Sequence, residues 1–349
     1  MTSGGKLLDQ GLYGCIFTPP LVCKNKKIQE AVEKDEDLQL SKLILTEYAK
    51  REDSVAKFIH KIPLWKNYFV VSETMCQPAI QQTEKDLPLC NPLDDQKLSQ
   101  FRLLIMRYGG ESMNRHSFNL ATFDLVDFAK HFVEAGAILN LFGIVHRDIH
   151  AGNILVDNQD VPRIIDFNLA IFVERDNLVG ALEHQYTPSL PQEPPDSALV
   201  NALRLGYDPM TVISSILTKR PSIQKISTLL GVSLSDMEEQ LEEFYRKSKS
   251  VRAGDDEAWF RVYWRTIDGW AIGVRLVEFI HSLSMWPQYK NKLKQAVKTL
   301  LPVLRGLCAV SPLARIDCVQ ALYQLDPTHF IIRKYATSWL EKVGSERRV

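Results

Sequence analysis

Two aspartates and an asparagine in the middle of the chain have the types and spacing that chemistry on a hydroxyl would need. Asp148, Asn153 and Asp166 fall on two predicted loops that flank a short two-stranded ribbon, so we expect their oxygen atoms at one rim. Asn153 and Asp166 would offer hard oxygen ligands to Mg²⁺ and leave positions for phosphates. Asp148 would accept the proton of an attacking hydroxyl. Each residue alone would be an ordinary turn residue, but their joint spacing favours the chemical interpretation.

The elements around these loops must hold them in place. Apolar residues recur at intervals of three and four over residues 128–142, which predicts a helix, and Gly143 follows at a position typical of a helix C-terminus. Two short strands are predicted at residues 154–156 and 163–165, and the segment between them has the composition of a turn. One loop therefore precedes this ribbon and the other follows it, so both lie at the same end of the ribbon.

In the rest of the chain the predicted secondary structure changes once, from mainly strands to mainly helices. The first 110 residues or so favour short strands, interrupted by one helix that starts at Thr46 and stops before Pro63. From Gly110 onward the pattern is mainly helical, apart from residues 186–196, where four prolines exclude regular structure. A capping box at residues 235–238 is predicted to open one of the later helices. This indicates a strand-rich N-terminal lobe and a helical C-terminal lobe, hinged near residues 107–111.

Composition excludes several classes of protein. The 349 residues carry 42 basic and 42 acidic side chains, so the chain lacks the global positive charge of a nucleic-acid binder. A hydrophobic fraction of 45% and a charged fraction of 24% are typical of globular proteins. The N-terminus has no apolar targeting segment, and no apolar run is long enough for a membrane span. We expect a soluble, cytoplasmic protein.

The cysteines also favour a cytoplasmic protein. None forms a CxxC pair, and their number and spacing do not resemble a disulfide framework or a zinc site. We therefore expect reduced thiols in a cytosol-like compartment. The cysteines are Cys15, Cys23, Cys76, Cys90, Cys308 and Cys318.

Residues 146–153, HRDIHAGN, and 164–168, IIDFN, resemble the catalytic loop and the metal-binding loop of the eukaryotic-type protein kinase family. The resemblance implies that Asp148 is the catalytic aspartate and that Asn153 and Asp166 hold Mg²⁺. It also implies that Arg147 ties the catalytic loop to the activation segment. His150 replaces the lysine common in Ser/Thr kinases and could donate to the γ-phosphate, although a histidine here is reminiscent of aminoglycoside- and choline-type kinases.

An N-terminal stretch resembles the last part of the kinase glycine-rich loop. It runs from residue 11 to 17, GLYGCIF, and implies contacts to ATP from Gly11, Tyr13, Gly14 and Ile16. The first glycine of the family pattern is Asp9 in this chain. Alone, such a stretch is usually a hairpin turn, so the interpretation depends on its position ahead of the catalytic loop.

The phosphate-binding lysine has several candidates. Lys42 lies on a predicted strand with alternating apolar residues, and we favour it, which implies an insertion around residues 18–37. Its expected partner is Glu52 on the following helix, with Glu47 as the alternative. The other candidate lysines lie in a segment that we interpret as a solvated turn, and they are Lys24, Lys26 and Lys27.

Three further stretches resemble kinase motifs. Residues 103–110 resemble the hinge, which implies adenine contacts from Met106 and Tyr108. Asp268 begins an Asp-x-Trp-x-x-Gly helix motif, in which it would brace the catalytic loop from below. Arg315 resembles the late arginine that pairs with a carboxylate closing the activation segment, here Glu193 or Asp196.

Together the motifs imply an α+β, bilobal protein-kinase-like fold. The N-lobe would be residues 1–107 and the C-lobe residues 108–349, with a helical insertion at about 197–262 that could dock a partner. The implied activity is transfer of the γ-phosphate of ATP, with Mg²⁺, to Ser/Thr hydroxyls of proteins. Two alternatives are a small-molecule kinase and a pseudokinase scaffold.

A narrower resemblance is carried by the tight glycine loop, the Pro19-to-Lys24 stretch and the late lysine strand. These features resemble divergent serine/threonine kinases of giant and other large DNA viruses. That origin would imply a location in the host cytoplasm or the virion. Phosphorylation of the chain itself is expected on the activation segment, at Tyr186, Thr187 or Ser189.

Overall fold

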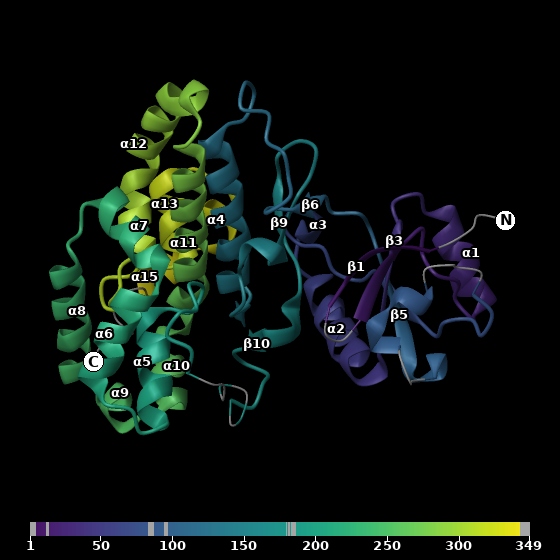
Figure 1. Ribbon diagram of the computed structural model, residues 1–349, viewed down its shortest axis with the longest axis horizontal. Helices are drawn as coiled ribbons and strands as arrows, with labels where there is room; N and C mark the ends of the chain where they lie inside the picture. Colours follow the sequence, from purple (N-terminus) through teal and green to yellow (C-terminus); the bar gives the residue numbers. More distant parts are fainter. Residues whose placement is uncertain are drawn as a thin grey trace. The chain divides into compact units, whose positions relative to one another are not determined.

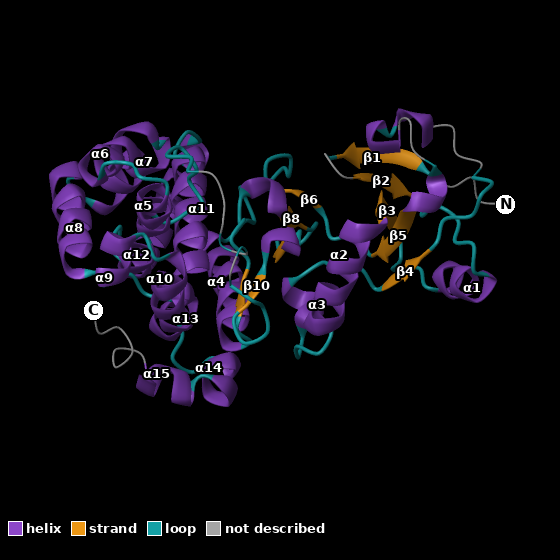
Figure 2. Cartoon of the chain, turned by 90° about the horizontal axis from the view of Figure 1, so that it is seen from below, coloured by secondary structure: helices purple, strands orange, loops and turns teal. Residues whose placement is uncertain are grey.

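The structure is a computed structural model that describes residues 5–11, 14–82, 87–93, 97–178, 180, 182 and 186–342 (Figure 1). The chain forms two compact units. The N-terminal unit comprises Met1–Glu111 and Arg163–Asn168, and the C-terminal unit comprises Ser112–Pro162 and Leu169–Val349. The first contains an antiparallel sheet and the second is larger and helical, which confirms the predicted α+β class (Figure 2).

The N-terminal unit is built on a five-stranded antiparallel sheet. The strand order is β1-β2-β3-β5-β4. The register places Ile16 opposite Lys42 and Lys42 opposite Leu104. The strands are β1 (Lys6–Gln10), β2 (Gly14–Thr18), β3 (Leu40–Leu45), β4 (Thr74–Cys76) and β5 (Phe101–Met106).

The two faces of this sheet are separate apolar clusters because side chains alternate along each strand. Leu43 and Leu103 belong to the larger cluster, whereas Ile44 and Leu104 belong to a smaller one that packs Ala49 of helix α2. Lys42 shares a face with Ile44, beside that helix. The helical elements here are α1 (Lys26–Lys34), α2 (Thr46–Ile59), α3 (Trp65–Tyr68), η1 (Leu87–Leu89), η2 (Asn91–Leu93) and η3 (Leu98–Gln100).

Two disulfides cross-link the N-terminal unit. They join Cys15 to Cys90 and Cys23 to Cys76, with Cα–Cα distances of 5.9 and 5.8 Å. The prediction that all cysteines are reduced is therefore wrong for four of the six. The pairs are 75 and 53 residues apart in sequence and meet only when the sheet forms, so local spacing does not reveal them. Cys308 and Cys318 are free and buried, in the C-terminal unit.

The insertion expected around residues 18–37 contains a helix. Asn25 caps α1 by accepting hydrogen bonds from the backbone N–H groups of Lys27 and Ile28. The expectation of a solvated turn here is wrong for Lys26 and Lys27, because this cap starts a helix at Lys26.

Two long helices form the centre of the C-terminal unit. They are α4 (Leu125–Leu141) and α11 (Ile267–Leu283), which lie side by side (Figure 1). Asp124 caps α4, and Gly143, with φ of 64°, follows its C-terminus as predicted. The remaining helices are α5 (Pro195–Arg204), α6 (Pro209–Lys219), α7 (Pro221–Leu230), α8 (Leu234–Lys247), α9 (Lys249–Ala253), α10 (Asp256–Tyr263), α12 (Lys290–Leu307), α13 (Cys318–Leu325), α14 (Phe330–Tyr335) and α15 (Thr337–Lys342).

Short elements carry the loops of interest. Strand β7 (Ile144–Val145) pairs with β10 (Ile171–Phe172) in the C-terminal unit. The other short strands are β6 (Glu111–Ser112), β8 (Ile154–Val156) and β9 (Pro162–Ile164). The short 3₁₀ turns are η4 (Ala151–Asn153), η5 (Phe167–Leu169), η6 (Trp264–Thr266) and η7 (Pro287–Tyr289).

The capping box of α8 differs from the prediction. Ser233, not Ser235, is the N-cap residue, and its hydroxyl accepts from the backbone N–H of Asp236. The prediction at residues 235–238 is wrong by two positions, because the helix starts earlier. Among the helices of the described ranges, none combines the length and the apolar character that crossing a bilayer requires.

Candidate active site

The catalytic loop is fixed from below by one buried carboxylate. The two oxygens of Asp268, near the start of α11, accept the backbone N–H groups of His146 and Arg147 at 2.7 and 2.9 Å. Burial raises the pKa of Asp268, while the charge of His146 and these hydrogen bonds oppose that rise. Arg147 has a φ of 70°, in the left-handed region, so the two bonds hold an unfavourable backbone turn.

Asp148 is held on both carboxylate oxygens and is still accessible. Its Oδ1 accepts from Nε2 of Gln192 at 3.1 Å, and its Oδ2 accepts from Nδ2 of Asn153 at 3.2 Å. The Asn153 amide also donates to the backbone carbonyl of Asp148 at 2.9 Å. The Asp148 side chain remains 27% exposed. The carboxylate is thus oriented by two neutral donors and has a free edge for an incoming hydroxyl.

His150 has a defined tautomer in its neutral form. Its Nδ1 accepts from the backbone N–H of Gly152 at 3.0 Å, which leaves the proton on Nε2. That Nε2 lies 3.7 Å from Oδ2 of Asp148. A Cβ at Gly152 would come within 2.8 Å of the imidazole, so the glycine makes room for this ring position.

Arg315 and the activation segment form a buried pair. The sequence left Glu193 and Asp196 open as its partner, and the structure pairs Arg315 with Asp196 at 2.6 Å, with both side chains fully buried. Nε1 of Trp259 donates to the other oxygen of Asp196 at 3.0 Å. Trp270 donates to the carbonyl of Pro191 at 2.9 Å. The end of the segment is therefore anchored to the helical core.

Glu193 lies beside a different arginine. Fully buried Arg220 donates to the carbonyls of Pro188 and Glu193 at 2.6 and 2.5 Å, and its guanidinium lies 4.0 Å from the Glu193 carboxylate. Burial lowers the pKa of Arg220 to about 10. Arg220 precedes α7, so the predicted insertion supplies this contact. Of the expected phosphorylation sites nearby, Ser189 is exposed, while Tyr186 and Thr187 are partly buried.

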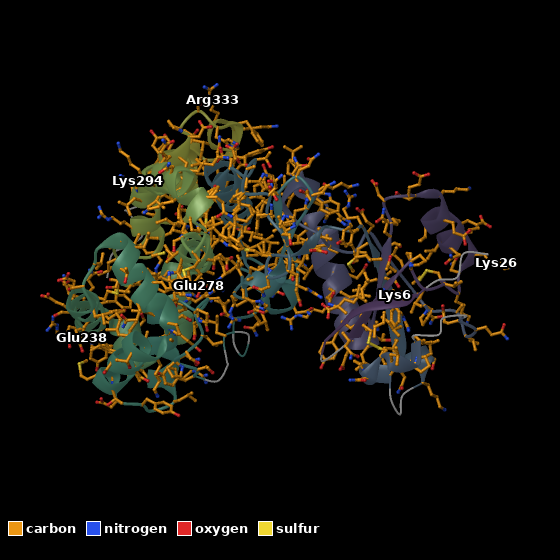
Figure 3. All side chains as sticks on the ribbon, turned by 45° about the horizontal axis from the view of Figure 1, so that its top comes forward. Lys6, Lys26, Glu238, Glu278, Lys294 and Arg333 are labelled. Carbon is orange, nitrogen blue, oxygen red and sulfur yellow. A yellow bond between two sulfur atoms is a disulfide. The ribbon has the colours of Figure 1, made fainter. Side chains whose placement is uncertain are left out.

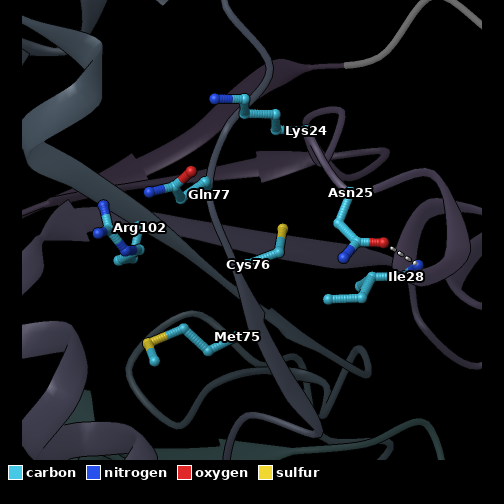
Figure 4. A pocket seen from close by; sticks show the side chains of 7 residues that line it. All are labelled: Lys24, Asn25, Ile28, Met75, Cys76, Gln77 and Arg102. Carbon is cyan, nitrogen blue, oxygen red and sulfur yellow. Dashed lines mark hydrogen bonds between the residues drawn. The ribbon is translucent and has the colours of Figure 1, made fainter.

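In the N-terminal unit, Lys42 and Glu52 meet. Nζ of Lys42 lies 2.6 Å from Oε1 of Glu52, and both side chains are mostly buried. The register β2-β3-β5 aims Lys42 from the central strand toward α2, while Glu47, the alternative partner, is exposed in the first turn of that helix. Lys24 instead lines a separate pocket of about 510 Å³ that also includes Cys76 and Arg102 (Figure 4).

Asp166 also belongs to the N-terminal unit and suits a cation. It has a φ of 65°, and its Oδ1 is buried without a hydrogen-bond partner among the described residues. A buried carboxylate oxygen without a donor is costly unless a cation is bound to it. Phe167 next to it packs edge-on against Phe69 with ring centroids 5.6 Å apart. An oxygen of this kind is a hard ligand of the type that Mg²⁺ prefers.

The glycine-rich stretch is a β-hairpin with a structural reason for one glycine. The backbone N–H of Gly11 donates to the carbonyl of Gly14 at 2.9 Å. A Cβ at Gly14 would lie 2.4 Å from the carbonyl of Leu43, so close strand packing alone requires glycine there. Ile16 pairs with Lys42 across the strands. Tyr13 lies outside the described residues.

The predicted adenine-binding residues lie at the end of the sheet. Met106 is the last residue of β5, pairs with Leu40 and packs against the smaller apolar cluster. Tyr108, two residues on, is exposed. Arg107 donates to Glu73 at 2.8 Å. The charge of Arg107, between these two residues, is therefore paired with a carboxylate of the same unit.

Each unit thus brings together part of the predicted set. The N-terminal unit contains Lys42, Glu52 and Asp166, and the C-terminal unit contains Asp148 and Asn153 with His150 and Arg147. Gln192, Arg220 and Trp259 were not predicted. Their contacts arise between segments far apart in sequence, and no local spacing signals them.

Comparison with known proteins agrees with the geometry. No curated protein matches the chain. Residues 21–190 match the family model for protein tyrosine and serine/threonine kinases. This stretch covers just under half of the chain and includes the Lys42–Glu52 pair, the loop at residues 146–153 and Asp166, so the matched region is similar to a protein kinase domain.

Proposed function

We propose that this chain transfers the γ-phosphate of ATP to Ser or Thr hydroxyls of protein substrates. The observation that best supports the proposal is the environment of Asp148, whose carboxylate is oriented by Asn153 and Gln192 and remains accessible. A carboxylate held in this way accepts the hydroxyl proton as the oxygen attacks phosphorus. The preference for Ser/Thr rests on residues 147–153, RDIHAGN, which lack the tyrosine-kinase form of this loop.

The other residues have supporting roles in the proposal. Lys42, oriented by Glu52, binds the α- and β-phosphates. Asn153 and Asp166 hold Mg²⁺, which neutralises charge on the phosphates when bound. His150, with its proton on Nε2, donates a hydrogen bond toward the γ-phosphate. Gly11, Gly14 and Ile16 cover the nucleotide, with Met106 and Tyr108 at the adenine.

We also propose an origin in a large DNA virus, from the sequence features between Gly11 and Lys42. Of the two locations this implies, the virion agrees better with the disulfides Cys15–Cys90 and Cys23–Cys76. Disulfides persist in oxidising settings and are rare in the reducing cytoplasm. Non-reducing electrophoresis of purified virions against infected-cell cytoplasm, with an antibody to this chain, distinguishes the two.

The activity is tested with purified full-length chain, ATP, Mg²⁺ and generic protein substrates such as casein. We expect transfer by the wild type and a loss of roughly 10²–10⁴-fold in kcat for Asp148→Asn. Asp166→Asn should show a similar loss, partly restored by raised Mg²⁺. The exposed Lys294→Ala on α12 serves as the matched control.

Phosphoamino-acid analysis of the product distinguishes the acceptor. Phosphoserine and phosphothreonine are expected. Predominant phosphotyrosine would refute the specificity and leave the kinase assignment intact. A wild type without transfer, or an Asp148→Asn variant at wild-type rate, would refute the catalytic assignment.

A further inference from the structure

A second open pocket in the C-terminal unit borders the catalytic loop. Its volume is about 900 Å³, and its lining comes from residues 113–114 and 116–121, Ala151 of the catalytic loop, Lys225 of α7, the second half of α11, and Trp286 and Gln288 after that helix. All of these residues belong to the C-terminal unit. The proposed phosphoryl transfer uses none of the side chains that line it.

One wall of the pocket is apolar. Phe118 and Phe279 pack with ring centroids 4.8 Å apart, and Leu283 and Trp286 continue this wall. The indole of Trp286 is half exposed. An apolar wall with an exposed aromatic ring is typical of a surface that binds a peptide side chain.

The pocket also contains an arginine with unused donors. Arg275 is 9% exposed, and its Nη1 lies 2.7 Å from Oε2 of Glu278. Its Nε and Nη2 are buried and have no hydrogen-bond partner among the described residues. Buried donors without acceptors are costly, so this position fits a second acceptor supplied from outside. Burial also lowers the pKa of Arg275 from its usual value.

The charges in this pocket favour an anion. Arg275 and Lys225 are cationic, and Glu278 is the carboxylate among the lining residues. Glu278 already pairs with Arg275, so its charge is compensated within the chain. Lys225 is half-buried and forms no ion pair within the described ranges. The positive charge of Lys225 and the two N–H donors of Arg275 therefore remain for a ligand.

The pocket lies close to Asp148, because one of its lining residues is near Asp148 in sequence. Ala151 follows Asp148 by three residues, and three extended residues span at most roughly 11 Å. A peptide that presents its hydroxyl at Asp148 can therefore reach the pocket edge with a side chain a few residues away.

We propose that this pocket binds the substrate polypeptide beside its phosphorylation site, and that Arg275 and Lys225 bind an Asp or Glu side chain within about five residues of the accepting hydroxyl. The proposal rests on the proposed function and adds a substrate class to it. The guanidinium fork suits a carboxylate, because two parallel N–H donors match its two oxygens.

The test uses serine peptides with one Glu placed at each flanking position in turn, and matched peptides with Gln or Lys there. We expect kcat/KM to be roughly tenfold higher for Glu than for Gln at one or two positions, as one charged hydrogen bond supplies. Arg275→Gln should reduce this ratio to about one, while activity on the Gln peptide stays near the wild-type value.

Three further variants make the test independent of the fold around Arg275. Lys225→Ala, at a half-buried site, should lower the Glu/Gln ratio about threefold. Glu278→Gln should raise the ratio, because it removes the competing carboxylate. Lys294→Ala, exposed on α12, should leave it unchanged; Glu278 and Lys294 are both labelled in Figure 3.

The outcomes separate this inference from the kinase assignment. Transfer to the Gln peptide with no preference for Glu at any position would overturn the inference and leave the proposed function intact. A preference for Lys that disappears in Glu278→Gln would also overturn it. If Arg275→Gln does not fold, an unchanged ratio in Lys225→Ala and Glu278→Gln would refute it. No transfer to any peptide would refute the proposed function instead.

Discussion

Asp148 has a different donor on each carboxylate oxygen. Asn153 is close in sequence, and its amide donates to both the side chain and the backbone carbonyl of Asp148. Gln192 comes from the Pro-rich segment 44 residues away and donates to the other oxygen. Two neutral donors fix the orientation of the carboxylate without the lysine that His150 replaces.

The Gln192 contact can be tested by removing its amide. Gln192→Ala should lower kcat about tenfold, because a hydrogen bond to a charged group is worth roughly 1.5–3 kcal/mol. KM for ATP should not change. Steady-state kinetics with the peptide substrate provide the measurement.

Gln159→Ala in the exposed turn after β8 is the matched control for this measurement. Gln192→Glu provides a second variant, because it places a like charge beside Asp148 and should lower kcat further than Gln192→Ala. A kcat for Gln192→Glu equal to that for Gln192→Ala would show that Gln192 acts only through the fold of its segment.

Among individual residues, the sequence predicts those whose proposed roles depend on partners close to them in sequence. Asp148, Asn153 and Asp166 could be proposed as site residues because the loops at residues 146–153 and 164–168 lie close together in sequence. Gln192 could not, because the prolines of residues 186–196 leave no periodicity from which to infer its direction. The choice between Glu193 and Asp196 for Arg315 also required coordinates, since both lie in one irregular segment.

At the scale of elements, the helices over residues 195–263 are joined to the activation segment. Arg220, between α6 and α7, binds the carbonyls of Pro188 and Glu193, and Trp259 of α10 donates to Asp196. In sequence, Gln192 lies between Pro188 and Glu193, whose carbonyls accept from Arg220. The predicted insertion is therefore a structural part of the C-terminal unit, and a docking role for it remains a prediction.

Replacement of Arg220 tests this connection. Arg220→Met keeps the volume but leaves two buried carbonyls without their donor, so we expect a loss of roughly 2–4 kcal/mol in the free energy of unfolding. We also expect a fall in kcat that exceeds the effect of Gln192→Ala. Urea denaturation followed by fluorescence, and the peptide assay, provide the measurements.

The neighbouring Lys219→Met, at an exposed position in the last turn of α6, is the matched control. If Arg220→Met retained wild-type stability, or if it unfolded more easily yet kept full kcat when folded, the insertion would not position the activation segment.

Helix prediction succeeded where one pattern was dominant. The helix α4 could be predicted because its apolar stripe and Gly143 agree on one end point. The cap of α8 could not be chosen reliably, because Ser233 and Ser235 both precede an acidic residue by three positions. The structure uses Ser233, and the helix gains two residues at its start.

At the scale of the whole molecule, the cysteines divide between the two units. Both disulfides lie in the N-terminal unit, and both free thiols lie in the C-terminal unit. Cys15 directly follows Gly14, so the Cys15–Cys90 bond links the proposed phosphate-binding hairpin to residues 87–93. The sequence could not predict these pairs. Net charge and local cysteine spacing do not show which cysteines meet when the sheet forms.

Thiol counting tests this division directly. The native chain should react with no equivalent of Ellman's reagent on a timescale of minutes. Four cysteines are oxidised, and burial raises the pKa of Cys308 and Cys318, which leaves little of the reactive thiolate. Unfolding in denaturant without reductant should expose two thiols, and reduction should bring the count to six. Alkylation followed by mass spectrometry should place the first two labels on Cys308 and Cys318.

Removing the cross-links should weaken one unit and not the other. The bonds close loops of 75 and 53 residues, and each should contribute roughly 2–4 kcal/mol to the stability of the N-terminal unit by restricting its unfolded chain. A Cys15→Ser/Cys90→Ser variant should therefore lose stability in the N-terminal unit, seen as faster amide exchange in β2 and β3, while α4 and α11 exchange as in the wild type. Six reactive thiols in denaturant alone would show instead that the chain is fully reduced, and the compartment inferred from composition would then stand.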